Sequence, residues 1–79
     1  PQRLVNIRVA DKHHVTDNEA VAEVIRTVEE ELGKNGRVLV RPSGTEPLVR
    51  VMVEAPSEDE CNRQVERIAE VVRAEMGID

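Results

Sequence analysis

The stretch "RVLVRPSGTEPLVRVMVE", residues 37–54, decides the fold of this chain because it predicts a β-hairpin. In residues 37–41, and again in residues 48–54, valines alternate with other side chains. A repeat of two residues places alternate side chains on opposite faces, as in a strand with one buried face. The middle part, "RPSGTEP" at residues 41–47, interrupts the alternation with two prolines and a glycine. We therefore expect two antiparallel strands joined by a long hairpin loop.

One further strand and two helices are expected around this hairpin. Residues 3–9 alternate in the same way and predict a strand. The polar stretch 10–17 has no periodicity and is interpreted as a loop. Apolar residues recur at helical spacing within residues 16–33 and 57–77, which predicts two amphipathic helices. The order β-α-β-β-α predicts an α+β domain: a small, mostly antiparallel sheet of three to four strands with two helices packed on one face.

Both predicted helices are bounded by recognisable signals. Gly33 and Gly77 follow the last apolar position of each helix, where glycine commonly ends a helix. Hydroxyl and acidic residues precede each helix and favour N-terminal caps. The candidate caps are Thr16 with Glu19, or else Asp17 or Asn18, for the first helix and Ser57 with Glu60 for the second.

The face of the sheet turned away from the helices is expected to be mostly polar, with three apolar exceptions. Leu4, Leu48 and Met52 fall on this face by alternation. Leu48 and Met52 indicate that something partly covers it. One alternative function is therefore a free-standing domain that binds a protein through this open face of its sheet.

Composition narrows the classes of protein. The chain has 79 residues, which suffices for one small domain. It has no aromatic residue on which a base or sugar would stack, and its net charge of −5 argues against a chain-wide basic field for nucleic acid or anionic lipid. The single cysteine fits a reducing compartment. No signal peptide or membrane span is expected, and the start at Pro1 fits processing or excision from a longer protein.

The hairpin loop carries the residue types of an anion site. Arginine side chains bind phosphate through two parallel hydrogen bonds, hydroxyls donate hydrogen bonds, and glycine lets the backbone approach a ligand. Glu46 would repel a phosphate, so it should face away or orient an arginine. The same residue types also build ordinary turns, and from spacing alone a plain structural turn stays the favoured reading. The candidate anion-binding residues are Arg41, Ser43, Gly44, Thr45 and Arg50.

Other candidate sites are weaker. His13 and His14 are adjacent, and neighbouring side chains rarely direct both rings at one metal without further ligands. Cys61 lies on the apolar stripe of the second helix, so we interpret it as a small core residue. The acidic run at residues 29–31 is interpreted as a solvated helix face. No catalytic residue and no metal site is assigned, because no nucleophile, base and orienting group assemble.

The segment "GRVLVRPSGTEPLVRVMVEA", residues 36–55, resembles the C-terminal domain of the α-D-phosphohexomutase superfamily, and within it the bacterial phosphoglucosamine mutases. The resemblance extends to "PQRLVNIRVADK" at residues 1–12 and "VVRAEMG" at residues 71–77, so it spans essentially the whole chain. The close variants of the loop in phosphoglucomutases and phosphomannomutases keep those branches as alternatives.

The resemblance implies that residues 1–79 are the last domain of a four-domain cytoplasmic enzyme. Such an enzyme interconverts glucosamine 6-phosphate and glucosamine 1-phosphate, on the route to UDP-N-acetylglucosamine and peptidoglycan. A phosphoserine of the first domain transfers the phosphoryl group through a bisphosphorylated sugar, Mg²⁺ is bound by the second domain, and the third recognises the sugar. The resemblance assigns the hold on the non-reacting phosphate to Arg41, Ser43, Gly44, Thr45 and Arg50. It implies phosphosugar and the other domains as partners, no cofactor held by this chain and no mutase activity of this chain alone.

Overall fold

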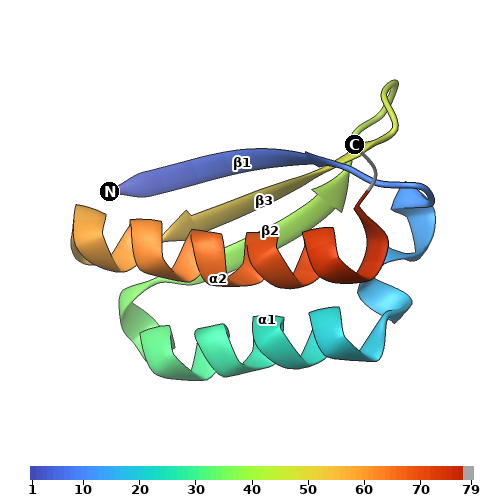
Figure 1. Cartoon of the computed structure of the whole chain (residues 1–79). Coiled ribbons are helices and arrows are strands. Elements are labelled where there is room, and N and C mark those ends of the chain that lie inside the picture. Colours follow the sequence, from blue (N-terminus) through green and yellow to red (C-terminus); the bar gives the residue numbers. More distant parts are fainter. Residues whose placement is uncertain (78–79) are drawn as a thin grey trace.

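The structure, a computed structural model that describes residues 1–77, is a three-stranded sheet with two long helices on one face (Figure 1). Along the chain the elements are β1 Gln2–Arg8, the 3-10 helix η1 Lys12–Asp17, α1 Glu19–Leu32, the 3-10 helix η2 Gly33–Asn35, β2 Arg37–Pro42, β3 Leu48–Glu54 and α2 Glu58–Met76. β3 lies in the middle and pairs antiparallel with both β1 and β2. The predicted α+β class, element order and one-sided helix cover are confirmed. Within residues 1–77 the only pairing beyond three strands is an isolated bridge between Val9 and Gly77.

The core lies between the sheet and the helices. The three valines of the central strand, Val49, Val51 and Val53, have no exposed surface, and Ile68 and Val72 of α2 are buried equally. Burying each such side chain contributes about 1.5–3 kcal/mol. The alternation of valines in residues 48–54 therefore supplies the surface on which both helices pack.

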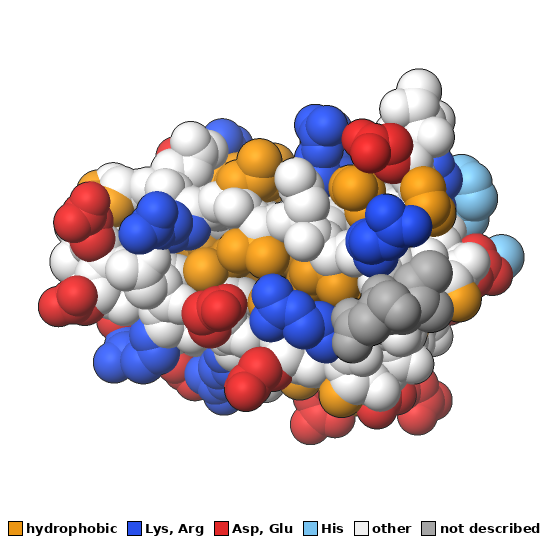
Figure 2. Space-filling view, turned by 45° about the horizontal axis from the view of Figure 1, so that its top comes forward, with side chains coloured by type: hydrophobic (Ala, Val, Ile, Leu, Met, Phe, Trp, Pro, Cys, Tyr) orange, Lys and Arg blue, Asp and Glu red, His pale blue; other side chains and the backbone are white. Residues whose placement is uncertain are grey.

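The core reaches the surface beside the edge strand β1. Val5 of β1 and Val71 of α2 are partly buried and pack against the core. Figure 2, which looks toward the side of β1 and α2, shows hydrophobic side chains along the middle of this face with charged side chains around them.

The helix ends agree with the predicted signals except at one residue. The side chain of Asn18 accepts a hydrogen bond from the N–H of Val21 at 3.1 Å, so Asn18 caps α1 and the Thr16 capping box is wrong. The Ser57 hydroxyl accepts from the N–H of Glu60 at 3.2 Å and caps α2 as expected. Gly33 ends α1 with φ of +57°, a conformation that side chains with a Cβ disfavour.

The predicted loop at residues 10–17 contains a 3-10 helix, η1, which corrects the sequence-based interpretation. Val15 within it is only 2% exposed and belongs to the core. A single buried side chain produces no apolar periodicity, so the pattern gave no sign of this helix.

The open face of the sheet carries an apolar row. Leu4, Met52 and Leu39 lie opposite one another across β1, β3 and β2, and Leu4 is 57% exposed. Met52 is nevertheless only 8% exposed. The leucines on both neighbouring strands account for the low exposure of Met52. The sequence had suggested that another surface covers it.

Candidate functional site

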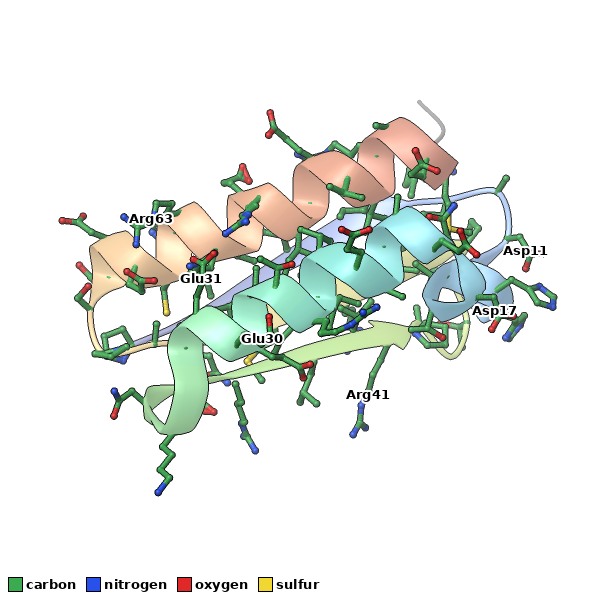
Figure 3. All side chains as sticks on the ribbon, turned by 90° about the horizontal axis from the view of Figure 1, so that it is seen from below. Asp11, Asp17, Glu30, Glu31, Arg41 and Arg63 are labelled. Atoms are coloured by element: carbon green, nitrogen blue, oxygen red, sulfur yellow. The ribbon has the colours of Figure 1, made fainter. Side chains whose placement is uncertain are left out.

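Two arginines face each other at the end of the hairpin. Arg41 of β2 lies directly opposite Arg50 of β3, and Asn6 of β1 lies opposite Arg50 on its other side. Strand alternation places these side chains on the face turned away from the buried valines. Figure 3 shows Arg41 extending from β2 away from both helices. The structure thus brings together two of the predicted site residues.

The charges of this arginine pair have no counterpart in the described part of the chain. Within residues 1–77, acidic side chains form salt bridges with His14, Arg37, Arg63 and Arg67, and none does so with Arg41 or Arg50. Like charges directly opposite across two strands destabilise a sheet. The pair borders a shallow hollow of about 270 Å³ that is completed by Leu4, Leu39 and Met52. The fold thus holds two like charges opposite each other at the edge of this hollow.

Ser43 organises the loop from within. It is only 6% exposed, and its hydroxyl oxygen accepts hydrogen bonds from the N–H groups of Thr45 at 3.4 Å and Glu46 at 3.3 Å. The N–H of Ser43 donates to the carbonyl of Leu48 at 2.9 Å. The hydroxyl proton of Ser43 is the one group of this side chain left to donate to a ligand.

Gly44 occupies a position where the fold does not require glycine. A Cβ built on it would have no atom within 4 Å, and the only positive-φ glycine in the described residues is Gly33. Free space beside a backbone is what a closely approaching ligand needs. Thr45 and Glu46 next to it are exposed. Glu46 was expected to face away from a phosphate or to orient an arginine. Within residues 1–77 its carboxylate forms no salt bridge with an arginine.

Lys12, which the sequence did not single out, holds the loop from the side. Its ammonium donates to the carbonyl of Ser43 at 2.6 Å and to that of Glu46 at 2.9 Å. The N–H of Val9 donates to the carbonyl of Pro47 at 3.1 Å. Because η1 and the loop are separated by about thirty residues and meet at one end of the molecule (Figure 1), no local pattern could reveal this contact.

The side chains of His13 and His14 have different surroundings. Nδ1 of His14 lies 2.7 Å from the carboxylate of Asp11, whereas His13 lines a hollow of about 340 Å³ between residues 10–13 and 45–47. Among the residues described, no three side chains of His, Cys, Asp or Glu are placed to hold a metal ion. Cys61 is fully buried, and its sulfur lies 3.4 Å from the carbonyl of Val53, which confirms it as a core residue.

The acidic run at residues 29–31 is only partly a solvated face. Glu31 lies between the helices (Figure 3), where its carboxylate accepts from Arg67 at 2.8 Å and from Gln64 at 3.0 Å. Hydrogen bonds from Arg67 and then Gln64 hold the pKa of Glu31 below its ordinary value. Hydrogen bonds from Gln64 and then Arg63 likewise lower the pKa of Glu60. The contacts of Glu31 join α1 to α2, whereas those of Glu60 lie within α2, and both groups lie away from the hairpin loop.

Comparison with known proteins identifies the family of this chain. Residues 4–71 match the family described as the phosphoglucomutase/phosphomannomutase C-terminal domain. The chain belongs to this family. It is 72% identical over 78 residues to the phosphoglucosamine mutase of Lysinibacillus sphaericus, covering 99% of this chain and 17% of that protein. It is 63% identical over 79 residues to the phosphoglucosamine mutase of Geobacillus kaustophilus, covering 100% of this chain and 18% of that protein.

Solved structures of this superfamily share the fold. The Aspergillus fumigatus N-acetylphosphoglucosamine mutase in complex with glucose 1,6-bisphosphate matches with a TM-score of 0.83 and 30% identity, over 99% of this chain and 16% of that one. The same enzyme in complex with GlcNAc-6P and magnesium matches with a TM-score of 0.77 and 32% identity, over 94% of this chain and 15% of that one. The chain thus spans about a sixth of the length of the relatives it matches. Within residues 1–77, the helices are too short or too polar to cross a membrane.

Proposed function

We propose that this chain is the phosphate-binding, C-terminal domain of a four-domain phosphoglucosamine mutase, with residues 1–79 as one domain. The enzyme would interconvert glucosamine 6-phosphate and glucosamine 1-phosphate in the cytoplasm, on the route to UDP-N-acetylglucosamine and peptidoglycan. The high identity to two phosphoglucosamine mutases supports this branch of the family. The phosphosugar and the other domains of the same enzyme are the proposed partners.

The observation that carries the proposal is the opposed pair of Arg41 and Arg50 at the end of the hairpin. Two guanidinium groups match the two charges of a phosphate, and each can donate two parallel hydrogen bonds to it. Binding would also relieve the repulsion between the two arginines, which lack a carboxylate partner in residues 1–77. The hydroxyls of Ser43 and Thr45 and the backbone at Gly44 would bind the remaining phosphate oxygens.

The role of these residues is positioning. They hold the phosphate that is not reacting, so that the other end of the sugar stays in line with the phosphoserine of another domain. In a reaction through a bisphosphorylated sugar, the same loop holds each phosphate in turn. Mg²⁺ would be bound outside this chain and would offset charge on the transferred phosphoryl group. The fungal relative in complex with GlcNAc-6P and magnesium supports a phosphosugar substrate and Mg²⁺ for the full-length enzyme.

The test is to change Arg41→Ala and, separately, Arg50→Ala in the full-length enzyme. Each loses charge-assisted hydrogen bonds worth about 1.5–3 kcal/mol, so kcat/KM for glucosamine 6-phosphate should fall about 10- to 100-fold. Arg37→Ala is the matched control, because Arg37 lies on the same strand and face but pairs with Glu54 at the other end. An unchanged kcat/KM in both hairpin variants would contradict the assignment.

A second candidate uses the apolar row on the open face. Leu4 is 57% exposed beside Leu39 and Met52, which favours contact with a protein surface. Replacing Leu4 by Ser tests it, because a free-standing interaction domain would then lose its protein partner. The phosphoglucomutase and phosphomannomutase alternatives are tested separately. Comparing kcat/KM for glucosamine, glucose and mannose phosphates distinguishes them from a phosphoglucosamine mutase.

A further inference from the structure

We propose that Lys12 is a positioning residue for phosphate binding, which aims the backbone N–H of Gly44 at the anion. This inference rests on the proposed function of the hairpin loop. The ammonium of Lys12 donates to the carbonyls of Ser43 and Glu46, 2.6 and 2.9 Å away. These two contacts fix the loop from the side of η1.

The contact with Ser43 determines the direction of the next N–H group. The described chain contains no cis peptide bond, so the carbonyl of Ser43 and the N–H of Gly44 point in opposite directions from one rigid plane. With the carbonyl held by Lys12, the N–H of Gly44 points away from η1. The contact of Lys12 with the carbonyl of Glu46 orients no further N–H group, because the next residue is Pro47, which has no N–H.

The N–H of Gly44 is also the one that the loop leaves available. The N–H groups of Ser43, Thr45 and Glu46 bond within the loop or to Leu48, whereas within residues 1–77 that of Gly44 has no hydrogen-bond partner. Space beside Gly44 is open, since a Cβ there would meet no atom within 4 Å. A free donor of fixed direction beside open space is an anion-binding group.

The ammonium itself is not the phosphate ligand in this arrangement. Two of its three N–H bonds are used by loop carbonyls, and Lys12 is partly buried against them. Its effect on substrate therefore passes through the loop backbone. A loop that loses this contact can rotate the plane between Ser43 and Gly44, which turns the donor away from the phosphate.

The experiment uses the full-length enzyme with glucosamine 6-phosphate and compares Lys12→Met with Lys12→Arg and Lys34→Met. Loss of one oriented donor to a charged group should raise KM about tenfold in Lys12→Met. Because the held phosphate is bound equally in the ground and transition states, kcat per folded enzyme should change less than twofold. Lys12→Arg keeps a donor for the carbonyls and should recover most of the affinity. Lys34, exposed in η2 at the opposite end (Figure 1), is the control and should leave KM unchanged.

A second measurement needs no substitution. In the wild-type enzyme, glucosamine 6-phosphate should slow hydrogen exchange at the Gly44 amide and leave Thr45 and Glu46, already bonded to Ser43, nearly unchanged. Slowed exchange at Gly44 with a raised KM in Lys12→Met supports the proposal. A KM for Lys12→Met within twofold of wild type, or no slowing at Gly44, overturns it. Normal KM values in Arg41→Ala and Arg50→Ala would instead refute the proposed function of the loop.

Discussion

Charged side chains are arranged in opposite ways between the two helices and at the end of the β2–β3 hairpin. Between the helices, Glu31 is paired with Arg67 and Gln64, and the pKa of its carboxyl is lowered as a result. At the hairpin, Arg41 faces Arg50, and no carboxylate of residues 1–77 pairs with either.

The difference separates charges that serve folding from charges that serve binding. A paired network lowers the free energy of the folded chain, whereas opposed like charges raise it until an anion arrives. Functional sites commonly carry such local conflicts, while the rest of the molecule compensates for them. Changes in the two regions should therefore affect different measurements.

Removing both arginines has the largest expected effect. The double variant Arg41→Ala, Arg50→Ala of the full-length enzyme should lower kcat/KM for glucosamine 6-phosphate by at least about 100-fold, since each lost contact is worth about 1.5–3 kcal/mol. Its free energy of unfolding should not fall, because a repulsive pair has been removed. Steady-state kinetics and urea denaturation measure the two quantities. The double variant Arg26→Ala, Arg37→Ala, which removes two exposed arginines elsewhere, controls for net charge in the kinetic measurement.

Gln64 provides the reverse case in the helix network. It is fully buried and bridges the carboxylates of Glu31 and Glu60 at 3.0 Å each. Gln64→Ala should lower the free energy of unfolding by about 1–3 kcal/mol, because two carboxylates lose a donor and a cavity forms. Urea denaturation checks this, with exposed Gln2→Ala as the control. A stability equal to wild type would show that the network does not hold α1 against α2.

The sequence alone predicts the elements better than it predicts their contacts. Valine alternation predicts the hairpin and Ser57 predicts the start of α2, since both signals are local. The contact of Lys12 with Ser43 and that of Glu31 with α2 depend on how distant elements pack. Nothing in the residues around either side chain encodes its partner.

The candidate site could be predicted from the sequence only in part. The residue types of the loop indicate an anion site, and alternation places Arg50 on the open face of its strand. That Arg41 lies directly opposite Arg50 depends on the register of the pairing, which the length and geometry of the loop determine. The hydrogen bonds of the Ser43 hydroxyl within the loop could also be seen only in the structure, because its partners are backbone N–H groups.

Gly44→Ala tests whether the hairpin end is shaped for a ligand. The added methyl group meets no atom of the chain within 4 Å, so the free energy of unfolding should change little. If the phosphate approaches the backbone here, the methyl group displaces it, and KM for glucosamine 6-phosphate should rise about tenfold, or about 1.4 kcal/mol. Enzyme kinetics and thermal unfolding of the full-length protein separate the two effects. A KM unchanged by the methyl group would place the phosphate elsewhere.

Acidification should give the smallest effect, and only in the helix network. The folded-state pKa of Glu31 and Glu60 lies below the ordinary value of 4.5, so the folded chain binds protons less readily than the unfolded chain. Their contribution to stability is therefore fully present above about pH 4.5 and is lost as the pH falls through the lower folded-state pKa. Glu31 is exposed and Glu60 is half-buried, so solvent partly screens both carboxylates and keeps the effect small. Urea denaturation between pH 6 and pH 3 should show a shallower loss of stability in Glu31→Gln than in wild type, and Glu29→Gln, an exposed neighbour, should follow wild type. Equal slopes in Glu31→Gln and wild type would mean that the paired carboxylate contributes nothing to folding, and the contrast with the hairpin would then rest on Gln64 alone.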